Sequence, residues 1–240
     1  MKPISMEMPD RLVADVDTLR HDYGRFFAEP LERGYGTTLG NALRRVLLAS
    51  LPGAAVTAVE IEGVPHEYTT VDGVVEDVVQ LVLNLKELRF NSTAERPHVC
   101  RIEHAGAGEI TAADIQCPAD IEVANPDQHI AYVDEGGSLI MNMTVETDHG
   151  FRAASYDDEA HRVIGAIPVD AIFSPVKRAN FTVEATRVGQ QTDFDRLVLD
   201  VWTDSTITPK EALTEAARIL TKHLEIFCDF DETYVEEIEE

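Results

Sequence analysis

Two short acidic motifs are the residues of this sequence best suited to chemistry. Asp193-Phe-Asp195 and Asp229-Phe-Asp231 each place two carboxylates two positions apart, a spacing that can hold Mg²⁺ for phosphoryl transfer. The first pair lies in an expected hairpin loop directly before Arg196, and the second lies at the start of an acidic tail. Neither belongs to a phosphate-binding motif. We therefore predict no metal ligands here, and a free-standing metal-dependent hydrolase stays open as the alternative.

His66-Glu67 is a second pair that could exchange protons, because imidazole titrates near neutral pH. Adjacent residues of an extended segment point to opposite faces, however, and no serine or cysteine nucleophile motif accompanies the pair. The eight histidines are scattered, and none forms an H-x-x-x-H pair that would indicate a metal site. The sequence predicts no catalytic residues, no cofactor and no metal.

The three cysteines, Cys100, Cys117 and Cys228, form no C-x-x-C motif. Their odd number argues against a disulfide framework and favours a reducing cytoplasm, so we expect a cytoplasmic protein. No apolar run reaches the roughly 18 residues of a membrane span, and the first ten residues lack the apolar core of a secretion signal. No membrane partner is expected.

The chain of 240 residues carries a formal net charge of −24, from 20 basic and 44 acidic residues. Such a surface repels phosphate backbones, which argues against direct DNA or RNA binding and favours protein partners. Acidity that serves only solubility, or a salt-adapted source, would give the same composition.

The stretch from Glu29 to Ser50 predicts a turn followed by an amphipathic helix. Gly34 and Gly36 supply the turn, Thr37 or Thr38 can cap the helix, and Pro52-Gly53 ends it. The helix is expected over about 39–50. Its two faces are Leu39, Leu43, Val46 and Leu47 on one side, and Asn41, Arg44, Arg45 and Leu48 on the other. The second face fits either an interface or an ordinary wet surface.

Two further helices are predicted. Asp72 is the expected cap of a helix over about 73–87, with Val74, Val78, Val82 and Leu85 facing a sheet. Thr208-Pro-Lys-Glu211 combines a capping threonine, a proline at the first position and an acid in the first turn, so a helix should run from there to about Cys228. The apolar arc of this last helix is wide, which predicts burial on two sides or sharing with another chain.

The remaining patterns predict short strands. They cover about 11–17, 23–28, 59–62, 99–102, 121–123, 130–133, 139–145, 181–186 and 197–202. The mixture of separate helices and hairpin-linked strands predicts an α+β fold.

An ordered series of segments closely resembles the assembly region of the bacterial, or plastid-type, DNA-directed RNA polymerase α subunit. The segments are Glu29 to Leu48, Val59 to Tyr68, Gly73 to Asp77, Leu83 to Lys86, Thr111 to Ile115, Phe173 to Val176 and Gln191 to Leu197. The resemblance covers about 10–228. It implies a non-catalytic subunit of a nucleotidyltransferase, cytoplasmic and associated with the nucleoid, which homodimerises and serves as the platform for the β and β′ subunits, with ω and σ joining in the holoenzyme.

The resemblance also implies a domain plan and interface residues. Residues 1–51 and 168–232 would form a dimerisation domain of an antiparallel sheet and two main helices, 52–167 an inserted strand-rich α+β domain, and 233–240 an acidic tail. The implied dimer residues are Tyr35, Leu39, Leu43, Leu224 and Phe227. The implied contacts are Arg45 and Leu48 with β, and Lys86 and Val169 with β′, while Asp170 matches a position near the large-subunit contact. A generic dimeric scaffold outside transcription stays open as a third interpretation.

Overall fold

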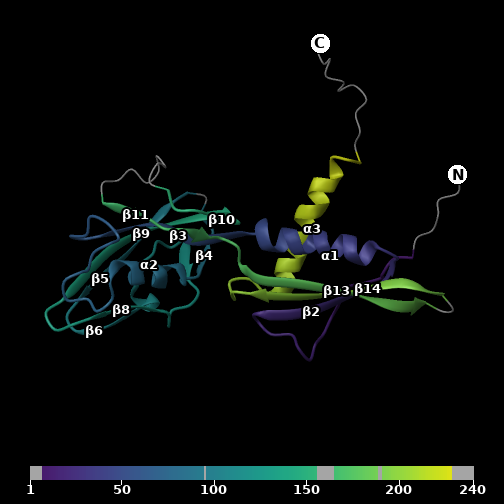
Figure 1. Ribbon diagram of the computed structural model, residues 1–240, viewed down its shortest axis with the longest axis horizontal. Coiled ribbons are helices and arrows are strands. Elements are labelled where there is room, and N and C mark those ends of the chain that lie inside the picture. The colour runs from purple at the N-terminus through teal and green to yellow at the C-terminus, as the bar shows by residue number, and fades with distance from the viewer. Residues whose placement is uncertain (1–6, 95, 156–164, 189–190, 229–240) are drawn as a thin grey trace, which may run out of the picture. The chain divides into compact units, whose positions relative to one another are not determined.

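The computed structural model describes residues 7–94, 96–155, 165–188 and 191–228, in which the chain forms two compact units. Unit 1 combines Met1–Ser50, Arg178–Trp202 and Thr208–Glu240, and unit 2 combines Leu51–Lys177 with Thr203–Ile207. Separate helices pack on antiparallel sheets in both (Figure 1), so the α+β prediction is confirmed. The chain passes between the units at 50/51, 177/178, 202/203 and 207/208.

Unit 1 is built on a four-stranded sheet of order β1-β2-β14-β13. The strands are β1 (Val13–Ala14), β2 (Tyr23–Glu32), β13 (Val176–Val188) and β14 (Gln191–Thr203). β14 pairs antiparallel with β2, with Leu199 opposite Phe26. Leu197, Leu199 and Val201 of β14 are buried at alternating positions, and Phe26 and Leu31 of β2 are buried as well.

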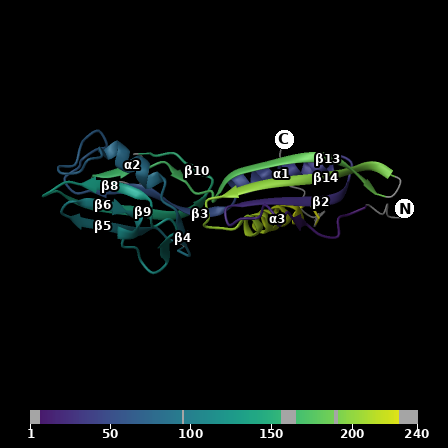
Figure 2. The same cartoon turned by 90° about the horizontal axis from the view of Figure 1, so that it is seen from below.

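Helices α1 (Tyr35–Ala49) and α3 (Pro209–Glu225) pack against each other and against this sheet, as Figures 1 and 2 show. Two glycines allow α1 to approach β13 closely. A Cβ atom on Gly40 would lie 2.5 Å from Cδ2 of Phe181, and one on Gly36 would lie 2.9 Å from Cγ1 of Val183. The helix-to-strand contact therefore depends on residues without side chains.

The start of α3 is formed as predicted. The Thr208 hydroxyl accepts a hydrogen bond from the Glu211 N–H at 3.3 Å, and the Glu211 carboxylate accepts one from the Thr208 N–H at 3.1 Å. These two bonds satisfy N–H groups that have no partner within the helix, and Pro209 occupies a first-turn position that needs no donor.

Unit 2 contains a larger sheet of order β5-β9-β3-β4-β7, with β11 also paired to β3. The bounds are β3 (Pro52–Ile61), β4 (Phe90–Ser92), β5 (His98–Ala105), β7 (Ile121–Val123), β9 (Ser138–His149) and β11 (Ala166–Pro168). Two small sheets pair β6 (Gly108–Thr111) with β8 (His129–Val133), and β10 (Phe151–Arg152) with β12 (Ala171–Ile172). A short 3₁₀ turn, η1 (Ala112–Asp114), follows β6.

Helix α2 (Val78–Lys86) closes the core of unit 2. Val78, Leu81 and Leu85 are each at most 1% exposed, and they belong to one continuous cluster with buried residues of β3, β5, β8 and β9. The predicted inward residues Val74 and Val82 pack at the margin of that cluster.

Two predicted helix starts are wrong. The N-cap of α1 is Gly34 in a left-handed conformation (φ 93°), and Thr37 and Thr38 lie inside the helix. The N-cap of α2 is Asp77, whose carboxylate accepts from the Gln80 N–H, and not Asp72. The residues before Asp77 are held by β8 instead, since Val74 forms a bridge with Val133.

Candidate interaction surfaces

An apolar groove of about 740 Å³ opens on unit 1. Leucines from several parts of the unit line it, namely Leu12 just before β1, Leu39 and Leu43 of α1, Leu197 and Leu199 of β14, and Leu213 of α3. Arg218, Lys222 and Glu225 of α3 form a charged part of its wall. Leu39 and Leu43 are only half-buried. An exposed apolar groove with polar residues beside it is typical of a protein–protein contact.

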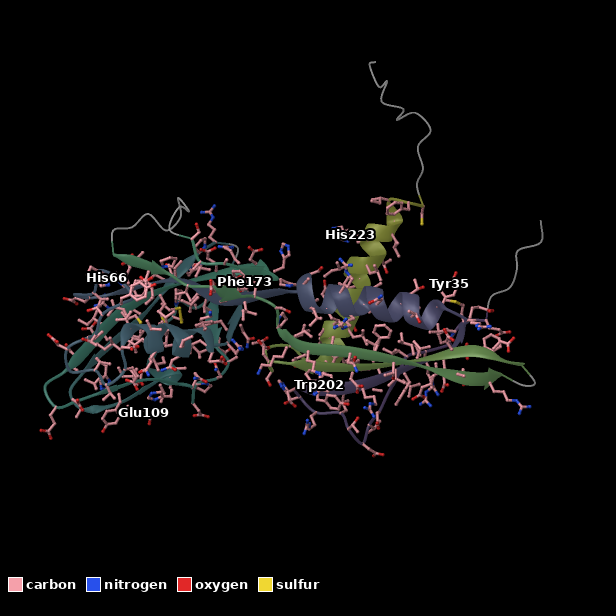
Figure 3. The ribbon with its side chains drawn as sticks, in the orientation of Figure 1. Tyr35, His66, Glu109, Phe173, Trp202 and His223 are labelled. Carbon is pink, nitrogen blue, oxygen red and sulfur yellow. A yellow bond between two sulfur atoms is a disulfide. The ribbon has the colours of Figure 1, made fainter. Side chains whose placement is uncertain are left out.

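The two halves of α3 differ in burial. Ala212, Leu213 and Ala216 in the first half are buried, whereas every residue from Thr221 to Cys228 is exposed. The exposed half extends past α1 in Figure 1, and His223 marks it in Figure 3. It carries three large apolar side chains, Leu224 (53% exposed), Ile226 (69%) and Phe227 (77%). The wide apolar arc predicted for this helix is therefore buried in the first half of α3 and exposed in the second half.

The outer face of α1 holds the predicted pair of Arg45 and Leu48. Arg45 is exposed and forms no hydrogen bond or ion pair with the described residues, and Leu48 beside it is half-buried. Arg44 is used differently, since its Nε donates to the Ala179 carbonyl of β13 at 3.1 Å. Tyr35, in the first turn of α1, is 46% exposed. Arg45 is thus available to a partner, whereas Arg44 holds α1 on the sheet.

The face of the unit 1 sheet that carries Trp202 is covered by its own side chains rather than by a helix (Figure 3). Arg178 stacks on Trp202 with its guanidinium carbon 4.6 Å from the ring centroid, and Arg196 stacks on Phe27 at 4.4 Å. Arg25 and Asp200 form an ion pair, in which Nε of Arg25 donates to Oδ1 of Asp200 at 2.7 Å. On this face the arginines lie over aromatic rings or pair with a carboxylate, so it differs from the apolar groove.

A second, smaller groove of about 220 Å³ lies along α2 in unit 2. Val79, Val82, Leu83 and Lys86 of α2 form one wall, and Ile167 to Asp170 form the other. Leu83 is 55% exposed and Val79 41%. Val169, one of the residues singled out in the sequence, is only 3% exposed and forms the floor.

Lys86 and Asp170 lie together at this groove, with Nζ and Oδ2 3.2 Å apart. Asp170 also accepts the Ala154 N–H at 2.8 Å. The Ala154 hydrogen bond, with the Lys86 ammonium as the second cause, lowers the pKa of Asp170 below its ordinary value. Both groups remain partly exposed, so the groove offers a paired positive and negative charge beside an apolar strip.

Of the two Asp-Phe-Asp motifs, the first contributes a carboxylate that stabilises the start of α1. Oδ2 of Asp195 accepts from the N–H groups of Gly34 (2.8 Å) and Gly36 (3.2 Å), at the start of α1. A carboxylate there satisfies free N–H groups and complements the helix dipole.

Asp229-Phe-Asp231 lies outside the described residues. His66 is exposed, and its ring centroid lies 6.5 Å from that of Tyr68. Within the described residues, no three His, Cys, Asp or Glu side chains are arranged so that they could hold a metal ion.

A charged cluster that the sequence did not reveal joins three segments of unit 2. The two ring nitrogens of His129 each lie 2.9 Å from a carboxylate, Nδ1 from Glu109 and Nε2 from Glu76. These hydrogen bonds, the one to Glu76 first, raise the pKa of His129. Burial pushes the pKa of Glu76 upward, but the Tyr132 N–H and His129 outweigh it, so that pKa is lowered.

The argument from the odd number of cysteines against disulfides is wrong for one pair. Cys100 and Cys117 form a disulfide, with Cα atoms 4.5 Å apart, and Cys228 is free and exposed. The parity of the cysteine count says nothing about which cysteines the fold brings together, and here a bridge between Arg101 and Gln116 places them side by side. The predicted cytoplasmic setting loses the support of that count.

Comparison with known families gives the class of the chain. Residues 59–174 match the model of the RNA polymerase Rpb3/RpoA insert domain. The match lies within unit 2, from the second half of β3 to the segment after β12. Among the described residues, no helix has both the length and the apolar character needed to cross a membrane.

Comparison with curated proteins extends the relation to nearly the whole chain. The DNA-directed RNA polymerase subunit alpha of Carboxydothermus hydrogenoformans is 54% identical over 218 residues, which are 91% of this chain and 70% of that protein. The proteins of the same name from Symbiobacterium thermophilum and Rhodopirellula baltica are 51% and 48% identical, over 95% of this chain and 72% and 69% of their own lengths. The chain belongs to the family of DNA-directed RNA polymerase α subunits.

Proposed function

We propose that this chain is a non-catalytic assembly subunit of a cytoplasmic, nucleoid-associated RNA polymerase. Two copies dimerise through unit 1, and the dimer is the platform on which the β and β′ subunits assemble, with ω and σ joining in the holoenzyme. Family membership supports the subunit role. The single observation that carries the assembly role is the apolar groove of unit 1 beside an uncovered apolar helix end.

Dimerisation is supported by two exposed apolar surfaces of unit 1, which could bury each other in a contact between two copies. In the part of the chain that the structure describes, no element covers the groove lined by Leu39 and Leu43, and the side chains of Leu224 and Phe227 on the end of α3 are exposed. Seating the α3 end of one copy in the groove of another would remove both from water by an isologous, self-complementary contact. Tyr35, at the start of α1, would lie at the margin of that contact.

Contact with the large subunits would use surfaces that remain free in such a dimer. Arg45 and Leu48 on the outer face of α1 are assigned to β, because an exposed arginine beside an apolar residue is typical of interface centres. Lys86 and Asp170 are assigned to β′, with Val169 supporting them from the groove floor and Leu83 supplying apolar area. Because the two copies are identical, each would present both surfaces, and the partners would use them unequally.

The experiment that tests this assignment removes Arg45 alone. Arg45→Ala should leave the dimer intact in sedimentation velocity, and should weaken capture of purified β at least tenfold in a binding assay, because a desolvated arginine contributes more than about 1.4 kcal/mol. Lys210→Ala, a loss of the same charge at the exposed start of α3, is the matched control and should change neither. Loss of the dimer in Arg45→Ala would show that the faces of α1 are assigned wrongly.

A further inference from the structure

The disulfide of unit 2 lies at a defined register position between two antiparallel segments. Arg101 of β5 and Gln116 exchange both backbone hydrogen bonds, at 2.9 and 2.8 Å. Cys100 and Cys117 are therefore the next, non-hydrogen-bonded pair of the same ladder. In such pairs the Cα atoms approach to about 4.5 Å, and the distance between Cys100 and Cys117 is 4.5 Å. Backbone pairing alone thus brings the two sulfur atoms together.

The two sides of this pair differ in how firmly they are held. Cys100 is 0% exposed and lies in the middle of β5, which is paired along its length with β9. Cys117 is half-buried at the margin of the core. Its segment is joined to β5 by the single Arg101–Gln116 pair, and the following residue, Pro118, has no N–H to extend the ladder. Opening two hydrogen bonds would expose Cys117 without unfolding the sheet.

We propose that Cys100 and Cys117 are a reversible thiol–disulfide pair, which exchanges with small-molecule disulfides and thiols and fastens the segment around Gln116 to the edge of β5. Disulfides in reducing compartments are usually transient and redox-sensing rather than permanent, and the inference rests on the cytoplasmic setting that the proposed function assigns. The buried position of Cys100 and the lightly held position of Cys117 match that use, because one sulfur is protected while the other can be reached by local opening.

The exchange proceeds in two balanced steps. The thiolate of Cys117 attacks one sulfur of a small disulfide such as oxidised glutathione, which forms a mixed disulfide and releases one glutathione thiolate. The thiolate of Cys100 then attacks the Cys117 sulfur, which forms the internal disulfide and releases the second glutathione. Two protein thiols are oxidised, one small disulfide is reduced to two thiols, and excess reduced glutathione reverses both steps.

The test equilibrates the purified 240-residue chain in buffers of varied reduced and oxidised glutathione, quenches with acid, and labels free thiols with N-ethylmaleimide in denaturant before mass spectrometry. Three labels mark the reduced chain, and one label, on Cys228, marks the chain with the internal disulfide. We expect a transition from three labels to one without a stable glutathione adduct. Three labels in every buffer, one label in every buffer, or a lasting glutathione adduct on Cys117 would each overturn the proposal.

Two variants and one stability measurement distinguish a reversible disulfide from two cysteines that merely lie close together. Cys228→Ser should keep the transition, now from two labels to none, whereas Cys117→Ser should abolish it. The wild-type chain should also unfold at a temperature about 5 °C or more higher when oxidised, since the bond closes a loop between residues 17 apart in sequence. An equal unfolding temperature in both states would show that the bond does not fasten the segment.

Discussion

The two compact units bury their apolar residues to different extents. In unit 2, one continuous cluster gathers side chains from α2 and the large sheet, and residues such as Leu81, Ile102 and Leu139 are 0% exposed. In unit 1, by contrast, Leu39 and Leu43 are left half-buried along an open groove of about 740 Å³. Unit 2 therefore has a closed core, whereas unit 1 leaves an apolar groove open, which is the surface proposed above to bind a second copy.

Because of this difference, similar apolar substitutions should have different effects in the two units. A change in the core of unit 2 should act on folding, because its residues are already surrounded. A change in the groove of unit 1 should act mainly on association, because its residues are only half-buried in the single chain and the proposed dimer would cover them. The following experiments, from the largest expected effect to the smallest, separate the two cases.

The largest effect is expected from Leu43→Glu, which places a charge in the groove. Burying an uncompensated carboxylate costs several kcal/mol, so the dimer dissociation constant should rise by at least about 1,000-fold, or roughly 4 kcal/mol. Sedimentation equilibrium measures this constant. Asn41→Glu introduces the same charge on the exposed side of α1 and should leave it within about threefold, so equal effects of the two changes would remove the groove from the interface.

Leu81→Ala should reduce the free energy of unfolding of unit 2 by about 2–5 kcal/mol, because it leaves a cavity at a side chain that is 0% exposed. Chemical denaturation followed by amide hydrogen exchange in 78–86 gives the value for this unit. Leu39→Ala is the comparison in unit 1, where the dimer should weaken while the isolated monomer loses less than about 1.5 kcal/mol. A loss of folding stability in Leu39→Ala as large as that in Leu81→Ala would contradict the contrast between the units.

Gly40→Ala should destabilise unit 1 by about 1–2 kcal/mol. The new Cβ would meet the Phe181 ring at 2.5 Å, which costs about 1–3 kcal/mol, and the better helix propensity of alanine offsets up to about 1 kcal/mol. Thermal denaturation gives the difference. Asn41→Ala, at the neighbouring exposed position, should be neutral or slightly stabilising, and a stabilising Gly40→Ala would show that α1 has room to move away from β13.

The smallest effect concerns His129. Its pKa is raised in the folded chain, so the charged ring stabilises unit 2 fully below its ordinary pKa of about 6.5, and this contribution is lost as the pH rises through the raised value. The pKa of Glu76 is lowered, so its contribution is lost only as the pH falls through that lowered value. The side chain of His129 is 41% exposed, and solvent screening keeps the effect at a few tenths of a kcal/mol.

The measurement for His129 compares amide exchange of residues 74–77 in wild type and His129→Gln. The variant should exchange faster near pH 6, and the difference from wild type should shrink as the pH rises through the raised pKa of His129 and the ring loses its charge. A difference that is the same below and above that pKa would mean that His129 acts through shape and not through charge.

The elements predicted best are those whose signals are local. The start of α3 was predicted from Thr208, Pro209 and Glu211, which act only on neighbouring backbone groups, and the prediction is confirmed. The starts of α1 and α2 were missed because distant segments decide them. Residues after Asp72 pair with β8 across the chain, which delays α2 to Asp77 and Val78.

The candidate surfaces were predictable in part. Helical spacing correctly puts Leu39 and Leu43 on one side of α1, but it does not show that Gly36 and Gly40 fill the closest contact, leaving the leucines at the groove. Likewise, Cys100 and Cys117 meet only through a pairing between segments far apart in sequence, so no local signal could have paired them. The roles of these surfaces in assembly stay predictions.

The central claim is that unit 1 is completed by a second copy of the chain, and sedimentation equilibrium of the unmodified protein tests it most directly. The account predicts a particle of twice the 26.6 kDa chain mass at concentrations down to roughly 1 µM, which corresponds to an association free energy of about −8 kcal/mol. A single-chain mass that persists up to roughly 100 µM, or about −5.5 kcal/mol, would contradict it.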